Sequence, residues 1–176
     1  MLVDSERLSH TVLIQMLAEM GVSIGFDDAV LRFMGTSLPT CLARVEELLG
    51  RAPPAEFLPR FAQRTRDAFE KDLAPVPGVA AVLDALDQRG VPFCVASNGN
   101  RAKVDFTLGH TGLLPRFAGR LFTADDVQHP KPAPDLFLHA ARCLGADPLR
   151  TVVVEDTPRA SPPPRRQACG PSASPP

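Results

Sequence analysis

Residues 91–98, VPFCVASN, decide how the rest of this sequence is interpreted. The stretch is a short apolar run, too short for an ordinary helix, that follows Gly90 and ends in a Ser-Asn-Gly-Asn turn. Such a run is typical of a buried strand in a parallel sheet. Ligands of open α/β sheets bind just beyond the carboxyl ends of strands, where Ser97 and Asn98 are placed. A hydroxyl beside an amide suits an anionic oxygen, although both residues are also common in ordinary turns.

The chain before this strand predicts four helices with no strand between them. Apolar residues recur at helical spacing over residues 5–20, 26–34, 37–50 and 55–73. Asp4 or Ser5 can cap the first helix, and Ser37 can cap the third. We therefore expect a compact helical subdomain at residues 5–74.

The chain after the stiff segment PVPG, residues 75–78, changes to alternating strands and helices. Further strands are expected at residues 121–123 and at the buried run TVVVE, residues 151–155. Helical patterns over residues 78–89, 101–108 and 134–144 accompany the strands. This alternation is the signature of an α/β fold with a right-handed parallel sheet.

Composition excludes several classes of protein. A chain of 176 residues with 44% hydrophobic content can form a real core, and a net charge of −1 argues against a nucleic-acid or membrane surface. No apolar run approaches the length of a membrane span. The cysteines Cys41, Cys94, Cys143 and Cys169 are scattered without a CxxC pair, which favours a reducing, cytoplasmic location.

Three polar segments follow strands or connect them, and a parallel sheet places them on one edge. Ser97 and Asn98 offer small polar groups, Lys131 an ammonium between two prolines, and Glu155 and Asp156 a carboxylate pair. Adjacent acids suit Mg²⁺, and the lysine suits a phosphate. Taken singly, Lys131 also fits a solvated loop and the acids also fit a helix cap. Together, these groups are the ones that a phosphoryl-transfer site uses to position a phosphate and neutralise its charge.

These motifs resemble the haloacid-dehalogenase-like hydrolase superfamily. The resemblance is closer to its helical-cap subfamily, which includes sugar-phosphate phosphatases and beta-phosphoglucomutase. VASNG is similar to the second motif, KPAPDLF to the lysine motif and VVVEDTP to the acidic motif, while MLVDSERL resembles the residues just after the first motif. The resemblance covers about residues 1–158 and implies a Rossmann-like parallel sheet core with an inserted four-helix cap.

The resemblance also implies roles for the polar residues. Ser97 and Asn98 would contact the transferring phosphoryl group, and Lys131 would neutralise it and orient the nucleophile. Glu155 and Asp156 would hold Mg²⁺. The partner implied is a small phosphorylated metabolite, with neither nucleic acid nor membrane. The oligomeric state is left open.

The chain departs from the family pattern at both ends. The first motif, a central strand ending in Asp-x-Asp-Gly, falls upstream of Met1, and Asp4 does not replace its nucleophile or its acid/base. Residues 1–4 are then a remnant that follows the first motif, and residues 75–158 are a core that lacks its central strand. The tail, residues 159–176, has six prolines between Pro162 and Pro176. We expect it to be disordered and to be a frame-shifted translation of the family's own C-terminal segment.

Several functions remain open at this point. The first is a Mg²⁺-dependent phosphatase that forms an aspartyl-phosphate in its full-length form, and the second is a phosphomutase. The segment RFMGTSLPTC, residues 32–41, is where cap contacts to a substrate would be sought. The third is a non-catalytic remnant of a broken gene, which is our expectation for these 176 residues taken alone. We expect that polypeptide to be inactive and its core to be molten or prone to aggregation.

Overall fold

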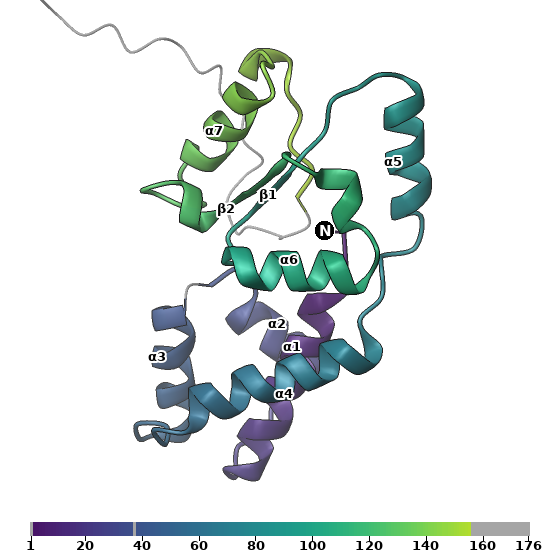
Figure 1. The fold of residues 1–176 in the computed structure, drawn as a ribbon. Helices are drawn as coiled ribbons and strands as arrows, with labels where there is room; N and C mark the ends of the chain where they lie inside the picture. The colour runs from purple at the N-terminus through teal and green to yellow at the C-terminus, as the bar shows by residue number, and fades with distance from the viewer. Residues whose placement is uncertain (1, 37, 156–176) are drawn as a thin grey trace, which may run out of the picture. The chain divides into compact units, whose positions relative to one another are not determined.

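The computed structural model describes residues 2–36 and 38–155 (Figure 1). The chain divides into two compact units, Met1–Pro77 and Gly78–Pro176. We call them the helical unit and the sheet unit and describe each by itself. The predictions made for Ser37, Asp156 and the tail at residues 159–176 lie outside the described residues.

The helical unit contains the four helices expected from periodicity. They are α1 (Ser5–Glu19), α2 (Phe26–Phe33), α3 (Leu38–Leu49) and α4 (Phe57–Asp72). Gly21, just past the end of α1, has a φ of 89°, a left-handed conformation that favours glycine. The capping prediction for Asp4 was wrong in detail, because its carboxylate pairs with the Arg7 guanidinium and makes no capping hydrogen bond.

The two ends of the helical unit run side by side. Val3 forms an antiparallel bridge with Pro75. The Asp4 amide donates to the Ala74 carbonyl over 3.1 Å, and the Val76 amide donates to the Leu2 carbonyl over 2.9 Å. The chain therefore enters and leaves the helical unit through one short paired segment.

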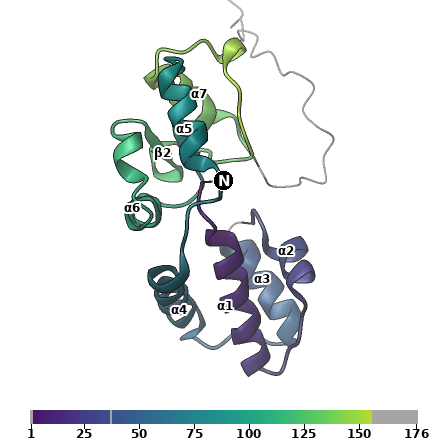
Figure 2. The ribbon, with the colours of Figure 1, turned by 90° about the vertical axis from the view of Figure 1, so that its right-hand side faces the viewer.

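The core of the helical unit forms where α1 packs against α4 and α2, as Figure 2 shows. Leu17, Ala29 and Val45 are fully buried in it. The other members of this buried cluster are Val12, Leu13, Met16, Phe33 and Phe57. Each fully buried aliphatic side chain of the size of valine or leucine contributes about 1.5–3 kcal/mol, so the helices are stabilised chiefly by their shared apolar faces.

The sheet unit is a βαβ arrangement with additional helices. Its helices are α5 (Val79–Gln88), α6 (Arg101–His110) and α7 (Asp135–Cys143), its strands are β1 (Val95–Ser97) and β2 (Leu121–Thr123), and short 3₁₀ turns lie at Leu114–Phe117, Ala124–Asp126 and Pro148–Arg150. The strands pair in parallel, with Ser97 opposite Thr123. Helix α7 contacts both strands and α6 contacts β2 (Figure 1). The expected α/β class with a parallel sheet is confirmed.

Two strand predictions need correction. The strand expected at residues 91–98 forms only at Val95–Ser97, and its residues are half-buried. The buried strand expected at residues 151–155 was wrong, because this segment forms no strand and Val152 and Val154 are 84% and 85% exposed. A strand requires a hydrogen-bonded neighbour, and the described residues offer none to this segment; their sheet consists of β1 and β2 alone.

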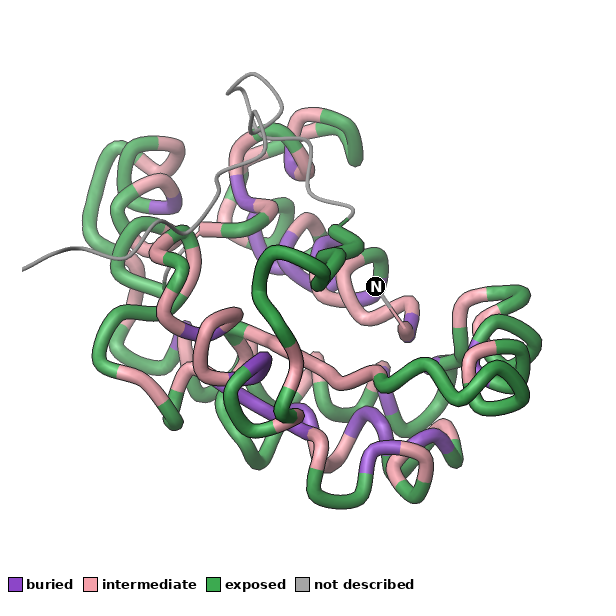
Figure 3. Tube along the Cα trace, turned by 90° about the horizontal axis from the view of Figure 1, so that it is seen from above, coloured by how far each residue is buried: buried purple, intermediate pink, exposed green. Residues whose placement is uncertain are grey.

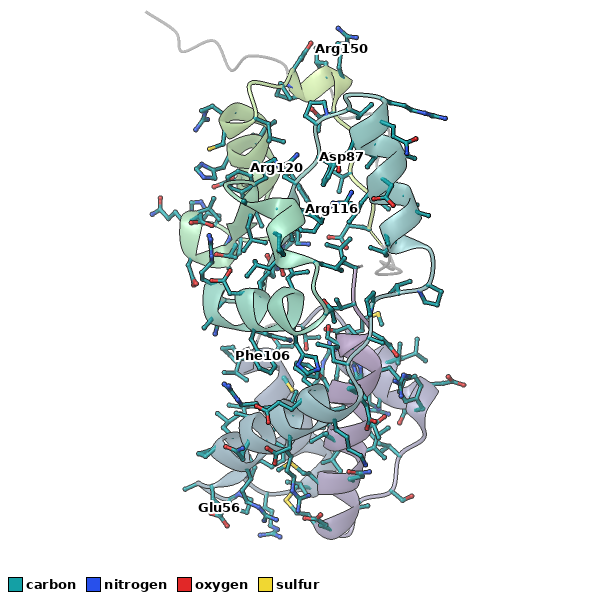
Figure 4. All side chains as sticks on the ribbon, turned by 45° about the vertical axis from the view of Figure 1, so that its right-hand side comes forward. Glu56, Asp87, Phe106, Arg116, Arg120 and Arg150 are labelled. Carbon is teal, nitrogen blue, oxygen red and sulfur yellow. The ribbon has the colours of Figure 1, made fainter. Side chains whose placement is uncertain are left out.

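The sheet unit has its own buried core and charged pairs beside it. Phe122, Leu136 and Ala140 form one buried cluster, Leu108 and Phe117 are buried as well, and Figure 3 shows buried residues in short stretches between exposed ones along the chain. Arg116 binds Asp84 over 2.8 Å and Asp87 over 2.7 Å on α5. Figure 4 shows Arg116 and Asp87 facing each other. The hydrogen bonds that Arg116 donates to Asp87 and Asp84 raise the pKa of Arg116, as expected when the charged form is the bound form.

Candidate functional site

The turn that follows β1 is packed tightly around a glycine. The Gly99 amide donates to the Ser97 hydroxyl oxygen over 3.1 Å. A Cβ at Gly99 would lie 3.2 Å from Val104 Cγ2 and 3.3 Å from Ser97 Oγ, closer than side chains ordinarily approach. The hydroxyl keeps its own hydrogen for donation, because a hydroxyl accepts and donates at the same time.

The start of α6 fixes the other side of this turn. Asn100 is the N-cap, and its side chain accepts a hydrogen bond from the Lys103 amide over 2.9 Å. The Arg101 amide donates to Asp125 Oδ2 over 2.8 Å. The turn after β1 is thereby tied both to its own helix and to the turn after β2.

Asn98 joins this turn to the loop that carries Lys131. Its Nδ2 donates to the Lys131 carbonyl oxygen over 2.8 Å, and its Oδ1 accepts from the Lys131 amide over 2.9 Å. One side-chain amide therefore satisfies both backbone groups of a residue 33 positions away.

The Lys131 side chain continues from this anchored backbone into a mostly enclosed position. Its Nζ forms an ion pair with Glu155 Oε1, and the side chain is 15% exposed. The same Nζ lies 5.6 Å from the centre of the Phe137 ring, on α7. Residues from three distant parts of the sheet unit meet here: Asn98, Lys131 and Glu155.

The structure thus gathers four of the five residues that the sequence singled out. Ser97 and Asn98 are consecutive at the end of β1, and Asn98 and Glu155 each contact Lys131. Asp156 lies outside the described residues. In the described part of the chain, no group of three or more His, Cys, Asp and Glu side chains is placed to hold a metal ion.

A magnesium ion nevertheless suits the donor set. Mg²⁺ in phosphoryl-transfer sites commonly takes only one or two carboxylates, keeps several waters and binds the substrate phosphate. Glu155 supplies one partly exposed carboxylate beside the lysine, and Asp156 follows it in the sequence. Few protein ligands are needed for binding of this kind.

Sequence reasoning missed the acids that follow β2. Asp126 accepts from the Thr123 amide over 2.6 Å and from the Thr123 hydroxyl over 3.1 Å, forming a capping box with the fully buried Thr123. Asp125 accepts a hydrogen bond from the Arg101 amide. The spacing Thr-Ala-Asp-Asp was the available signal, because a threonine followed by an acid three residues later predicts this motif. Both acids therefore have structural roles.

A parallel sheet with small polar groups, a lysine and a carboxylate beyond its strands defines a candidate phosphate site of an α/β hydrolase. The family model described as haloacid dehalogenase-like hydrolase matches residues 5–161. The chain belongs to this family. The expected class, with its Rossmann-like core and helical cap, is confirmed.

The curated relatives include phosphatases. The chain is 30% identical to 6-phosphogluconate phosphatase of Escherichia coli over 159 residues, which covers 89% of this chain and 70% of that protein. It is also 36% identical over 160 residues to the protein SUPPRESSOR OF QUENCHING 1, chloroplastic, of Arabidopsis thaliana, covering 88% of this chain but 15% of that protein.

Solved structures agree with this assignment. A haloacid dehalogenase family hydrolase of Deinococcus radiodurans, solved with bound phosphate and sodium, superposes with a TM-score of 0.71 at 31% identity. The match covers 85% of this chain and 65% of that chain, so the chain spans just under two thirds of its structural relative. None of the helices in the described residues is long and apolar enough to cross a membrane.

Proposed function

We propose that this chain carries the phosphate-binding part of a Mg²⁺-dependent phosphatase for a small phosphorylated metabolite, with sugar phosphates as the substrate class. The observation that carries the proposal is the meeting of Asn98, Lys131 and Glu155 beyond the end of β1. Membership of the hydrolase family supports it. The names of relatives that act on 6-phosphogluconate and fructose-1-phosphate support the substrate class.

Each residue has a distinct task in this proposal. Ser97 donates its hydroxyl hydrogen to a phosphoryl oxygen, because its oxygen already accepts from the Gly99 amide. Lys131 neutralises part of the phosphoryl charge and turns from Glu155 to the incoming anion. Glu155, with Asp156, would hold Mg²⁺, which would supply further positive charge at the phosphoryl oxygens.

Further parts of the proposal concern the whole polypeptide. Residues 5–74 would act as a cap over a core at residues 75–158. A cytoplasmic location is supported by the free thiols of Cys41, Cys94 and Cys143. The nucleophilic aspartate implied by the family motif is not among residues 1–176, so this polypeptide would bind phosphate without turning over a phosphate ester.

Binding of inorganic phosphate tests the site directly. Titration calorimetry with Mg²⁺ present should show binding that Lys131→Ala weakens at least about tenfold, since hydrogen bonds to charged groups contribute about 1.5–3 kcal/mol. Lys71→Ala, the same charge change at an exposed position of α4, should leave the affinity unchanged. Equal losses in both variants, or no binding by the unaltered chain, would contradict the proposed site.

Turnover is the second measurement. Hydrolysis of p-nitrophenyl phosphate by the 176-residue polypeptide should stay at background. Turnover on the order of 1 per second or more that is lost in Asp156→Ala would show that this polypeptide has its own nucleophile. The proposal that the polypeptide is inactive would then be wrong.

A further inference from the structure

Among the described residues, the hydrogen bonds of the Asn98 side chain go to a peptide backbone. Its amide donates to the Lys131 carbonyl and accepts from the Lys131 N–H, at 2.8 Å and 2.9 Å. These are the two bonds that a neighbouring strand would make to the same residue. Because the carboxamide group is planar, the pair fixes both the position and the orientation of the Lys131 peptide groups.

This backbone position determines where the ammonium can reach. From it, Lys131 Nζ meets Glu155 Oε1 and lies 5.6 Å from the centre of the Phe137 ring. A lysine has a flexible four-carbon side chain, so an unanchored loop would spread the ammonium over a wide volume. The close turn from Pro130 to Ala133, closed by a 3.1 Å backbone hydrogen bond, does not by itself tie the loop to β1.

We propose that Asn98 is a positioning residue that holds the Lys131 backbone so that the ammonium stands at the carboxyl end of β1. The inference rests on the proposed function, because the position matters only if Lys131 meets a phosphate. It differs from direct contact between the Asn98 amide and a phosphoryl group. In the structure the amide oxygen and one amide hydrogen are already bonded to Lys131.

The Phe137 ring provides a signature of the lysine position that requires no phosphate. Lys71 and Lys103 are the other lysines of the chain, so protein labelled with ¹³C at lysine Cε has one signal for each. The Lys131 methylene protons should be displaced from the free-lysine position by the magnetic field of the ring. Asn98→Ala should move the Lys131 signal toward that of free lysine and weaken inorganic phosphate binding about tenfold or more.

Two variants make the test specific. Asn100→Ala removes the neighbouring asparagine of the same turn, which caps α6 and does not bond to Lys131. It should lower stability yet leave the Lys131 signal in place. Asn98→Asp keeps the acceptor for the Lys131 N–H and loses the donor to its carbonyl, so it should give an intermediate displacement. If Asn98→Ala does not fold, Asn98→Asp alone tests the positioning role.

The outcomes separate the inference from the function on which it rests. An unmoved Lys131 signal in both Asn98 variants would overturn the positioning role, even if phosphate binding is lost. An equal movement in Asn100→Ala would overturn it as well, since the turn as a whole would then be responsible. Movement of the Lys131 signal toward that of free lysine in Asn98→Ala, with no phosphate binding by the unaltered chain, would support the positioning role and contradict the proposed function.

Discussion

An apolar segment of the helical unit and one of the sheet unit differ in how far their side chains are buried. Helix α1 buries Leu13, Met16 and Leu17 against its neighbours. In the sheet unit the run TVVVE, residues 151–155, leaves Val152 and Val154 almost fully exposed. A helix makes its backbone hydrogen bonds within its own segment, whereas a strand has none until another strand lies beside it. The apolar face of α1 is therefore buried, while the apolar run at residues 151–155 stays exposed.

Hydrogen exchange should show the largest difference between the two regions. Amides of α1 beyond its first turn exchange only when the helix opens, while no backbone hydrogen bond reaches the amides of residues 152–155 within the described part of the chain. We expect α1 to exchange at least on the order of 10³-fold more slowly than residues 152–155. Mass spectrometry of peptic fragments would measure both segments in one sample.

Helix α7 serves as the internal comparison, because it lies in the sheet unit but is helical and buries Leu136. It should exchange more slowly than residues 152–155. Protection of residues 152–155 equal to that of α1 would mean that they are hydrogen-bonded to another strand. The contrast between a buried helix and an unpaired apolar segment would then not hold.

Truncating a core side chain of the helical unit should give the next largest effect. Leu17 is fully buried in α1, so Leu17→Ala should lower the free energy of unfolding by about 2–5 kcal/mol. Leu31→Ala makes the same chemical change on α2 at a side chain that is 82% exposed, and it should cost less than about 0.5 kcal/mol beyond helix propensity. Urea unfolding followed by circular dichroism would compare them. Similar losses would show that α1 does not have the packed core described.

Periodicity was sufficient for the helices because each helix is specified by a local pattern. The predicted first and second helices end within one residue of those in the structure, at Glu19 and Phe33. Strands were less predictable. The runs at residues 91–98 and 151–155 look alike in sequence, yet only the first contains a strand, because only β1 has a described neighbour in β2. Local sequence does not say which strand lies beside which.

The candidate site was predictable as a set of residues and less so as a set of contacts. Ser97 was located by its place at the end of a strand and Lys131 by its place between prolines, whereas the strand that pointed to Glu155 does not form. That the Asn98 amide would bond to the Lys131 backbone could not be read from the sequence, since 33 residues separate them. The contact depends on where the loop before α7 falls relative to β1. That position is set by the packing of α7 on both strands.

The smallest expected effect concerns a surface ion pair of the helical unit and its dependence on pH. Glu19, near the end of α1, binds Arg64 over 2.5 Å and Arg60 over 3.2 Å, both on α4. The hydrogen bond from Arg64, with the charges of both arginines, lowers the pKa of the Glu19 carboxyl below its ordinary value of 4.5. Since the folded state prefers the ionised form, the stabilisation is present above pH 4.5 and is lost as the pH falls through the lowered value.

Glu19→Gln should therefore reduce the free energy of unfolding slightly at pH 7, and the difference from the unaltered chain should vanish in acid. The pairs are solvent-exposed, so the effect at pH 7 should also shrink in 1 M salt. Glu47→Gln, the same change at an exposed position of α3, has no ion pair among the described residues and should show neither dependence. A Glu19→Gln deficit that persists unchanged throughout an acid titration would mean that the side chain acts through packing against α4, and the charge pair would then contribute nothing to the stability of the helical unit.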